Sequence, residues 1–161
     1  MNPKLIYIDA GHGGTDPGAV GAQAREKDIN LAVALQVGRA LTQRGFAVCC
    51  SRTKDMRMTV TERARAANKA KAAAFVSIHC NSAANKAARG AETFAYSPAS
   101  KGYGLAKTIQ RNLVNTTGTP CRGTKTANFA VLRETAMPAA LVELGFLSNK
   151  IDEQFLLDSQ W

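Results

Sequence analysis

One segment constrains the fold more than any other: "AAFVSIHCN", residues Ala73–Asn81, is apolar along nearly its whole length. A strand of this kind has no side that suits water, which is typical of a sheet that is covered on both faces. We therefore predict that this segment lies inside a sheet and that helices cover both faces of that sheet.

Strand-like and helix-like patterns alternate along the chain. Strands are predicted at residues 4–9, 46–51, 73–81, 91–97, 128–133 and 139–145, and helices at 27–44, 59–71 and 100–115. Thr59 and Glu62 form a T-x-x-E capping box at the start of the second helix. The alternation predicts an α/β fold: a single domain with a mixed, mostly parallel twisted sheet of about six strands, flanked by helices on both faces.

Three side chains that could bind a metal or transfer protons lie at the far ends of predicted strands. They are His12 and His79, which are the chain's two histidines, and Glu143. Ligands of open α/β sheets bind outside the carboxyl ends of the strands, so these side chains converge if their strands are parallel neighbours. Taken singly, each histidine could instead be a hydrogen-bonded structural residue, and Glu143 could be paired or half exposed.

Glu143 lies between Val142 and Leu144 in an apolar strand, where an unpaired carboxylate is costly. A divalent metal with its bound water would supply the missing partner. A catalytic zinc site takes three protein ligands, so two histidines do not complete one. Glu26 is the best third candidate, because it lies where a glycine-rich segment ends and the first helix begins. The alternative is that Glu26 only complements the positive end of that helix.

Other features narrow the function class. The glycine-rich segment "IDAGHGGTDPG" matches neither GxxxxGK[ST] nor GxGxxG, so nucleotide binding is not expected. The four cysteines contain no CxxC pair, and we expect free thiols. The net charge of +9 favours an anionic partner, such as nucleic acid, a membrane surface or an acidic wall polymer. Few aromatic residues and scattered basic ones weigh against nucleic acid.

Four segments together resemble the zinc-dependent N-acetylmuramoyl-L-alanine amidases of the amidase-3 type, which occur in bacterial autolysins and phage endolysins. The segments are "IYIDAGHGGTDPGAVG", "REKDINLAVAL", "FVSIHCNS" and "NFAVLRETAMPAALVELGFLSN". Their order and spacing agree with the family from Leu5 to Leu157. The resemblance implies one Zn²⁺ per chain, held by His12, Glu26 and His79, with Glu143 as the catalytic carboxylate. We further expect Asp9 and Asp16 to accept the histidine N–H groups, and Asn128 and Arg122 to contact the peptide stem.

The implied reaction is hydrolysis of the peptidoglycan amide between the lactyl group of N-acetylmuramic acid and L-alanine of the stem peptide. In that reaction a zinc-activated water attacks the amide, and Glu143 takes the water's proton and passes it to the departing amine. Two alternatives stay open. The chain could be a catalytically inert basic module that binds wall or nucleic acid, or it could be a different zinc peptidase.

The family also sets expectations for the domain and its surroundings. Residues 1–161 are expected to form the catalytic domain, without the family's final C-terminal helix and without a cell-wall-binding domain. The expected partner is peptidoglycan, with no nucleic acid, no membrane span and a monomeric state. The N-terminus shows no signal-peptide pattern. We therefore expect action on the bacterial wall, either after release from the cytoplasm as an endolysin or in a form from which a leader has been removed.

Overall fold

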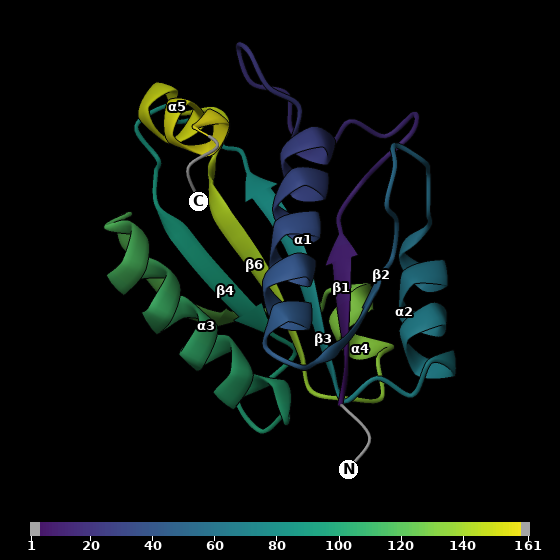
Figure 1. Ribbon diagram of the computed structural model, residues 1–161. Helices are drawn as coiled ribbons and strands as arrows, with labels where there is room; N and C mark the ends of the chain where they lie inside the picture. The colour runs from purple at the N-terminus through teal and green to yellow at the C-terminus, as the bar shows by residue number, and fades with distance from the viewer. Residues whose placement is uncertain (1–3, 159–161) are drawn as a thin grey trace.

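A computed structural model describes residues 4–158 and shows a six-stranded sheet between layers of helices (Figure 1). The strands are β1 Leu5–Ala10, β2 Ala47–Cys50, β3 Ala74–Asn81, β4 Ala91–Ala95, β5 Cys121–Thr126 and β6 Ala139–Phe146. The helices are α1 Glu26–Gln43, α2 Val60–Lys69, α3 Gly102–Thr117, α4 Ala130–Arg133 and α5 Lys150–Leu157.

The strand order is β2-β1-β3-β6-β4-β5, with β4 antiparallel to β6 and every other neighbouring pair parallel. This confirms the predicted mixed, mostly parallel sheet. The apolar segment β3 lies inside the sheet, between β1 and β6, as predicted. Because β1, β3 and β6 are parallel neighbours, their carboxyl ends meet at one rim, the upper end of the sheet in Figure 1.

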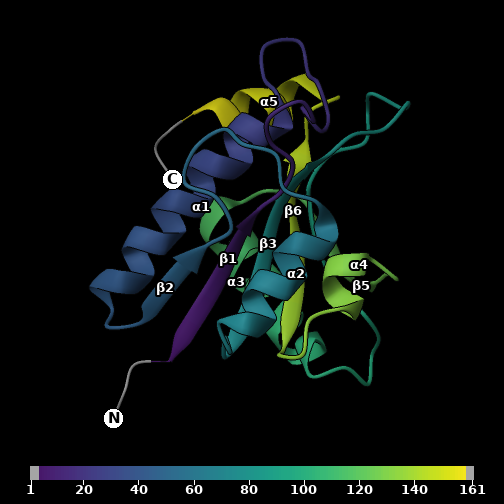
Figure 2. The ribbon, with the colours of Figure 1, turned by 90° about the vertical axis from the view of Figure 1, so that its right-hand side faces the viewer.

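Helices cover both faces of the sheet, as Figure 2 shows for α1 on one side and α2 and α4 on the other. Alternate residues of a strand point to opposite faces. Thus Ile8 and Val142 belong to the core beneath α1, whereas Tyr7 and Leu141 belong to the core beneath α2 and α4. The two cores pack on opposite faces of the sheet, and the rim above them carries His12, Glu26 and His79.

The predicted capping box is confirmed at the start of α2. The Thr59 side chain accepts a hydrogen bond from the Glu62 backbone N–H at 3.2 Å, and Glu62 Oε2 accepts one from the Thr59 backbone N–H at 2.7 Å. The box fixes where α2 begins, and α2 carries Arg63 on its buried side.

The predicted strand at residues 128–133 is wrong. Residues 130–133 form the short helix α4, whose adjacent residues Val131 and Leu132 both enter the core. The sixth strand is instead β5, "CRGTKT", which was not predicted. It is an edge strand that pairs only with β4, so it carries polar residues and lacks the apolar pattern by which a strand is recognised.

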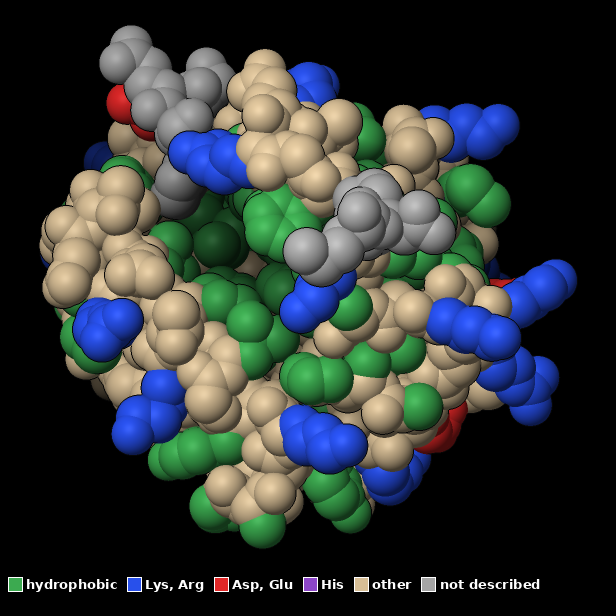
Figure 3. All heavy atoms as spheres, turned by 60° about the horizontal axis from the view of Figure 1, so that its bottom comes forward, with side chains coloured by type: hydrophobic (Ala, Val, Ile, Leu, Met, Phe, Trp, Pro, Cys, Tyr) green, Lys and Arg blue, Asp and Glu red, His purple; other side chains and the backbone are tan. Residues whose placement is uncertain are grey.

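An apolar groove runs between α1 and α3 over the sheet. Its volume is about 560 Å³, and its lining includes Val37, Leu41, Val76, Ile109 and Leu113. Figure 3 shows apolar side chains inside a hollow of the surface and basic side chains scattered over the same view rather than gathered in a patch. No helix within residues 4–158 is both long enough and apolar enough to cross a membrane.

Candidate metal centre

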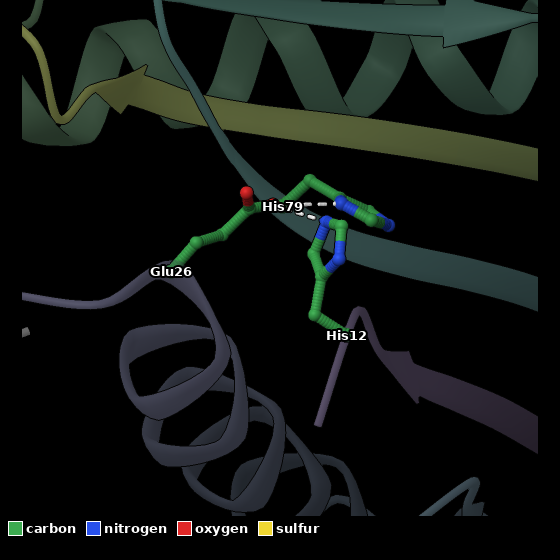
Figure 4. A group of neighbouring side chains, drawn as sticks. All are labelled: His12, Glu26 and His79. Carbon is green, nitrogen blue, oxygen red and sulfur yellow. Dashed lines mark hydrogen bonds and ion pairs between the residues drawn. The ribbon is translucent and has the colours of Figure 1, made fainter. Parts of the chain in front are cut away.

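His12, Glu26 and His79 come together at the rim (Figure 4). Glu26 Oε1 lies 3.2 Å from His12 Nε2 and 2.8 Å from His79 Nδ1. One ligand atom from each of the three residues lies within 4.8 Å of the others. Two imidazoles and a carboxylate are a ligand set that zinc accepts in catalytic sites. The chain therefore contains a group that could hold a metal ion, built from residues far apart in the sequence.

The loop after β1 holds His12 in an unusual backbone conformation. His12 has φ of 60°, in the left-handed region that residues other than glycine seldom adopt. Arg63 Nη2 donates to the His12 carbonyl at 2.7 Å, and Arg52 Nη2 donates to the Gly11 carbonyl at 3.0 Å. His12 Nδ1 forms a hydrogen bond with Asp16 Oδ2 at 2.8 Å, which leaves Nε2 directed at Glu26. Two buried arginines and one aspartate thus fix the imidazole.

Gly11 is required by the position of His79. A Cβ atom placed on Gly11 would collide with three atoms of the His79 ring. The imidazole therefore lies directly against the backbone of the β1 loop. A glycine at position 11 therefore leaves space for the ring.

Glu26 is the first residue of α1 and is only 4% exposed. Its Oε2 accepts the backbone N–H of Ala19 at 2.7 Å, and its Oε1 accepts the backbone N–H of Cys80 at 3.1 Å. Burial alone would raise the pKa of Glu26, but hydrogen bonds from His12 and His79 outweigh burial and hold the pKa well below its usual range. Glu26 is therefore ionised, as a metal ligand must be.

The charge of Glu26 acts in turn on His12. The hydrogen bond to Glu26 raises the pKa of His12 to about 9, against the opposing effect of burial. In the metal-free protein His12 is then protonated at neutral pH. A divalent cation would take the place of this proton between the same two side chains.

Glu143 lies beside the group on β6, in register with His79 of β3 on one side and with Glu92 of β4 on the other. Burial raises the pKa of Glu143 to about 7, although His79 opposes the shift. Glu143 Oε2 is buried and has no hydrogen-bond partner within residues 4–158. An orphaned carboxylate oxygen next to a His-Glu-His group fits a partner such as a metal-bound water.

The two aspartates differ in what they contact. Asp16 bonds to His12 Nδ1, the contact expected of it. Asp9 is fully buried, and its oxygens accept from Arg63 Nη1 at 2.7 Å and from the Ser77 hydroxyl at 2.6 Å. The expectation that Asp9 accepts a histidine N–H is thus corrected. Asp9 is linked to the loop of His12 through Arg63 of α2.

Asn128 and Arg122, the expected contacts to a peptide, lie farther from the metal group. Asn128 is exposed and accepts from Arg133 Nη1 at 2.6 Å. Arg122 is on β5, where its Nε donates to Glu92 Oε2 at 3.0 Å. Neither residue contacts the His-Glu-His group in the structure. Glu92, which holds Arg122, was missed because a glutamate in a short strand gave no sign of its partners.

The chain matches the N-acetylmuramoyl-L-alanine amidase family over residues 6–161. It is 39% identical over 162 residues to the sporulation-specific N-acetylmuramoyl-L-alanine amidase of Bacillus subtilis, and 41% identical over 161 residues to an endolysin of Bacillus phage SPP1. These matches cover 97% and 96% of this chain but 61% and 58% of the relatives. The chain thus spans about three fifths of their length.

Solved structures agree with the fold over nearly the whole chain. The catalytic domain of CwlV, an N-acetylmuramoyl-L-alanine amidase from Bacillus (Paenibacillus) polymyxa, is 42% identical with a TM-score of 0.91, and the match covers 96% of this chain and 87% of that one. An N-acetylmuramoyl-L-alanine amidase from Clostridium difficile 630 is 38% identical with a TM-score of 0.94, covering 98% and 88%.

Proposed function

Since the chain belongs to the N-acetylmuramoyl-L-alanine amidase family, we propose that it hydrolyses the peptidoglycan amide between the lactyl group of N-acetylmuramic acid and L-alanine of the stem peptide. The observation that carries the proposal is the His12–Glu26–His79 group with the orphaned Glu143 Oε2 beside it. An inert binding module would have no use for a buried carboxylate that lacks a partner.

The proposed cofactor is one Zn²⁺ per chain, held by His12 Nε2, a carboxylate oxygen of Glu26 and His79. Bound there, zinc supplies a Lewis acid for the scissile carbonyl and a water of lowered pKa. Asp16 keeps the proton of His12 on Nδ1, so that Nε2 offers its lone pair to the metal. The backbone N–H groups of Ala19 and Cys80 fix the orientation of the Glu26 carboxylate.

Glu143 is the proposed general base and acid. A group with a pKa near the working pH both accepts and returns a proton efficiently, and the pKa of Glu143 is raised to about 7. Its Oε2 is free to take a proton from the attacking water. Glu143 then delivers this proton to the nitrogen of the departing L-alanine, which leaves as an amine.

We propose that the chain works as a monomer on the bacterial wall, because a single chain supplies all of the metal-site residues. The net charge of +9 would draw it to anionic wall polymers, less so as salt rises. The proposal is compatible with release as an endolysin or with export by a leader. It requires neither nucleic acid nor a membrane anchor.

The apolar groove between α1 and α3 supports the expectation that the catalytic domain includes a further helix. The groove is lined almost wholly by aliphatic side chains. Such a surface is costly to leave open to water. The two solved relatives contain residues beyond the matched part, since the matches cover 87% and 88% of their chains. We propose that the added segment is a helix with an apolar face that fills the groove.

Digestion of purified cell wall tests the activity. Free L-alanine amino groups should appear without new reducing sugar ends, and a chelator should abolish their release. Glu143→Gln should bind zinc but release nothing, whereas His79→Ala should lose zinc as well. Lys107→Met, on α3 away from the site, is the control. New reducing ends would indicate a glycosidase, other new amino groups a different zinc peptidase, and binding without release an inert module.

A further inference from the structure

A second polar cluster lies beside Glu143 and takes no part in the mechanism above. Glu92 of β4 is in register with Glu143 across the antiparallel β4–β6 pair and is only 4% exposed. Its Oε1 accepts from Asn81 Nδ2 at 2.8 Å. Its Oε2 accepts from two cations of β5, Arg122 Nε at 3.0 Å and Lys125 Nζ. One buried carboxylate therefore forms ion pairs with two positively charged side chains.

The cluster carries an excess of one positive charge, and its cations reach the surface. The side chains of Arg122 and Lys125 are 34% and 41% exposed. An arginine has five N–H donors and a lysine three; Glu92 uses one from each, and the Arg89 carbonyl accepts one more from Arg122 Nη1 at 3.4 Å. The Arg122 guanidinium also lies 4.7 Å above the Phe146 ring, which restricts its orientation. The pair is thus held in place with unused donors, as a preorganised anion site would be.

The distance from Glu143 sets which part of a substrate could reach the pair. Strand β4 alone separates β5 from β6, so the cations lie about two strand spacings, roughly 10 Å, from the catalytic carboxylate. An extended peptide covers that distance in about three residues. A ligand group bound by the pair would therefore belong to a residue close to the scissile amide.

The charges of the substrate indicate whether the bound group lies on the glycan side or on the peptide side of the scissile amide. On the glycan side, the lactyl carboxyl is consumed in the amide and the N-acetylated sugars are neutral. On the peptide side, the stem residues that follow L-alanine carry carboxylates. Two cations suit a carboxylate, and charge-assisted hydrogen bonds of this kind are stronger than neutral ones.

We propose that Arg122 and Lys125, held by Glu92, form a subsite for a free carboxylate of the peptide stem. The subsite rests on the proposed amidase function, because it places the stem on the β5 side of Glu143. It makes the protein selective: a stem whose carboxylate is converted to the neutral amide loses the charged contacts. This assigns Lys125 a role that its sequence context does not indicate, and it gives Arg122 a defined ligand.

Binding to two muramoyl peptides that differ only in a free or amidated stem carboxylate tests the subsite. Calorimetry on the zinc-loaded Glu143→Gln variant avoids turnover. We expect the acid to bind about tenfold more tightly than the amide. Lys125→Met and Arg122→Gln should each reduce this preference by weakening only the binding of the acid. Lys125→Arg should keep it, and so should the distant control Lys107→Met.

Equal binding of the two peptides, or a preference that Lys125→Met leaves unchanged, overturns the subsite. The subsite is also overturned if Lys125→Met loses binding to a glycerol-phosphate polymer but keeps its binding to the peptides. The pair would then bind wall polymers. Wild-type digestion of wall separates this failure from that of the proposed function. Release of L-alanine amino groups without acid preference leaves the amidase and removes the subsite. A preference for the acid peptide without release of amino groups would keep the carboxylate subsite and remove the proposed amidase activity.

Discussion

The guanidinium of Arg63 and the carboxylate of Asp9 form a buried ion pair, with Nη1 2.7 Å from Oδ1 and side-chain exposures of 3% and 0%. Arg63 also donates to the backbone carbonyl of His12 at 2.7 Å. The pair therefore joins β1 and α2 to the loop that carries a proposed metal ligand. Its effect on the metal centre passes through the loop backbone, because Arg63 donates to the carbonyls of Ala10 and His12.

We expect Arg63→Met to lower the free energy of unfolding by about 3–5 kcal/mol, because the substitution leaves the Asp9 carboxylate buried without its cation. Urea unfolding of the metal-free protein measures this loss. Arg65→Met, an exposed position on the same helix, is the matched control and should change stability by less than about 0.5 kcal/mol. The same Arg63→Met change should cost less in an Asp9→Asn background, and strict additivity would contradict the coupling.

Gly11→Ala should weaken metal binding while the fold is kept. The new Cβ would occupy the space of the His79 ring, so the imidazole must leave its position beside Glu26. We expect a loss of zinc affinity of about 10–100-fold, the range seen when the support of a ligand is removed. Competition with a chromophoric chelator measures it.

Gly104→Ala is the control for that change, because a Cβ there meets no atom within 4 Å and the position is inside α3. It should raise stability by about 0.5–1 kcal/mol and leave zinc affinity unchanged. Equal zinc affinity in Gly11→Ala and the wild type would show that His79 is not confined as described.

Zinc affinity should rise with pH across the neutral range. The pKa of His12 is raised to about 9, so below that pH each bound zinc must displace a proton from the imidazole. The apparent affinity should therefore increase about tenfold per pH unit, and it should level off near pH 9. Calorimetry in buffers of different ionisation enthalpy counts the released proton. Affinity that is flat from about pH 6.5 to 8.5 would rule out this exchange.

Glu143→Gln should stabilise the metal-free protein at alkaline pH. The pKa of Glu143 is raised from 4.5 to about 7 in the folded state, so folding takes up a proton between these values. Stability therefore falls as pH rises through this window, and the penalty is complete above it. Removing the charge should restore roughly 3 kcal/mol at about pH 8 and nothing near pH 4. Denaturant unfolding of both proteins at the two pH values checks the sign.

The patterns that predicted the fold correctly were those with a local physical cause. The unbroken apolar run of β3 indicates a doubly covered strand, and the Thr59–Glu62 capping box indicates a helix start. The polar edge strand β5 has no local sequence pattern that predicts it, because it is defined only by its tertiary pairing with β4. The apolar segment at residues 128–133 predicts a strand but forms α4, because adjacent apolar residues such as Val131 and Leu132 suit a buried strand and a short helix alike.

The metal group could be predicted because its members lie at strand ends or helix starts, where topology brings distant residues together. The hydrogen bonds and ion pairs that hold these residues in place could not be predicted. Asp9 was expected to accept from a histidine, but a nearer and stronger donor, Arg63, reaches it from another element. Likewise, the partners of Glu92 come from two other strands, β3 and β5, which only the folded sheet brings beside β4.

The reversed direction of β4 has a consequence for how access to the site can change. Because β6 lies between β3 and β4, the connection at residues 82–90 passes across the end of β6 near Glu143. It is fastened there, since Asn149 Nδ2 donates to the Lys86 carbonyl at 2.7 Å and the Ala83 N–H donates to the Ser148 hydroxyl at 3.0 Å. Lengthening this connection would add a cover over the reactive carboxylate and leave every strand pairing in place. Access to the reactive carboxylate therefore depends on the length of a connection that lies outside the strand pairings.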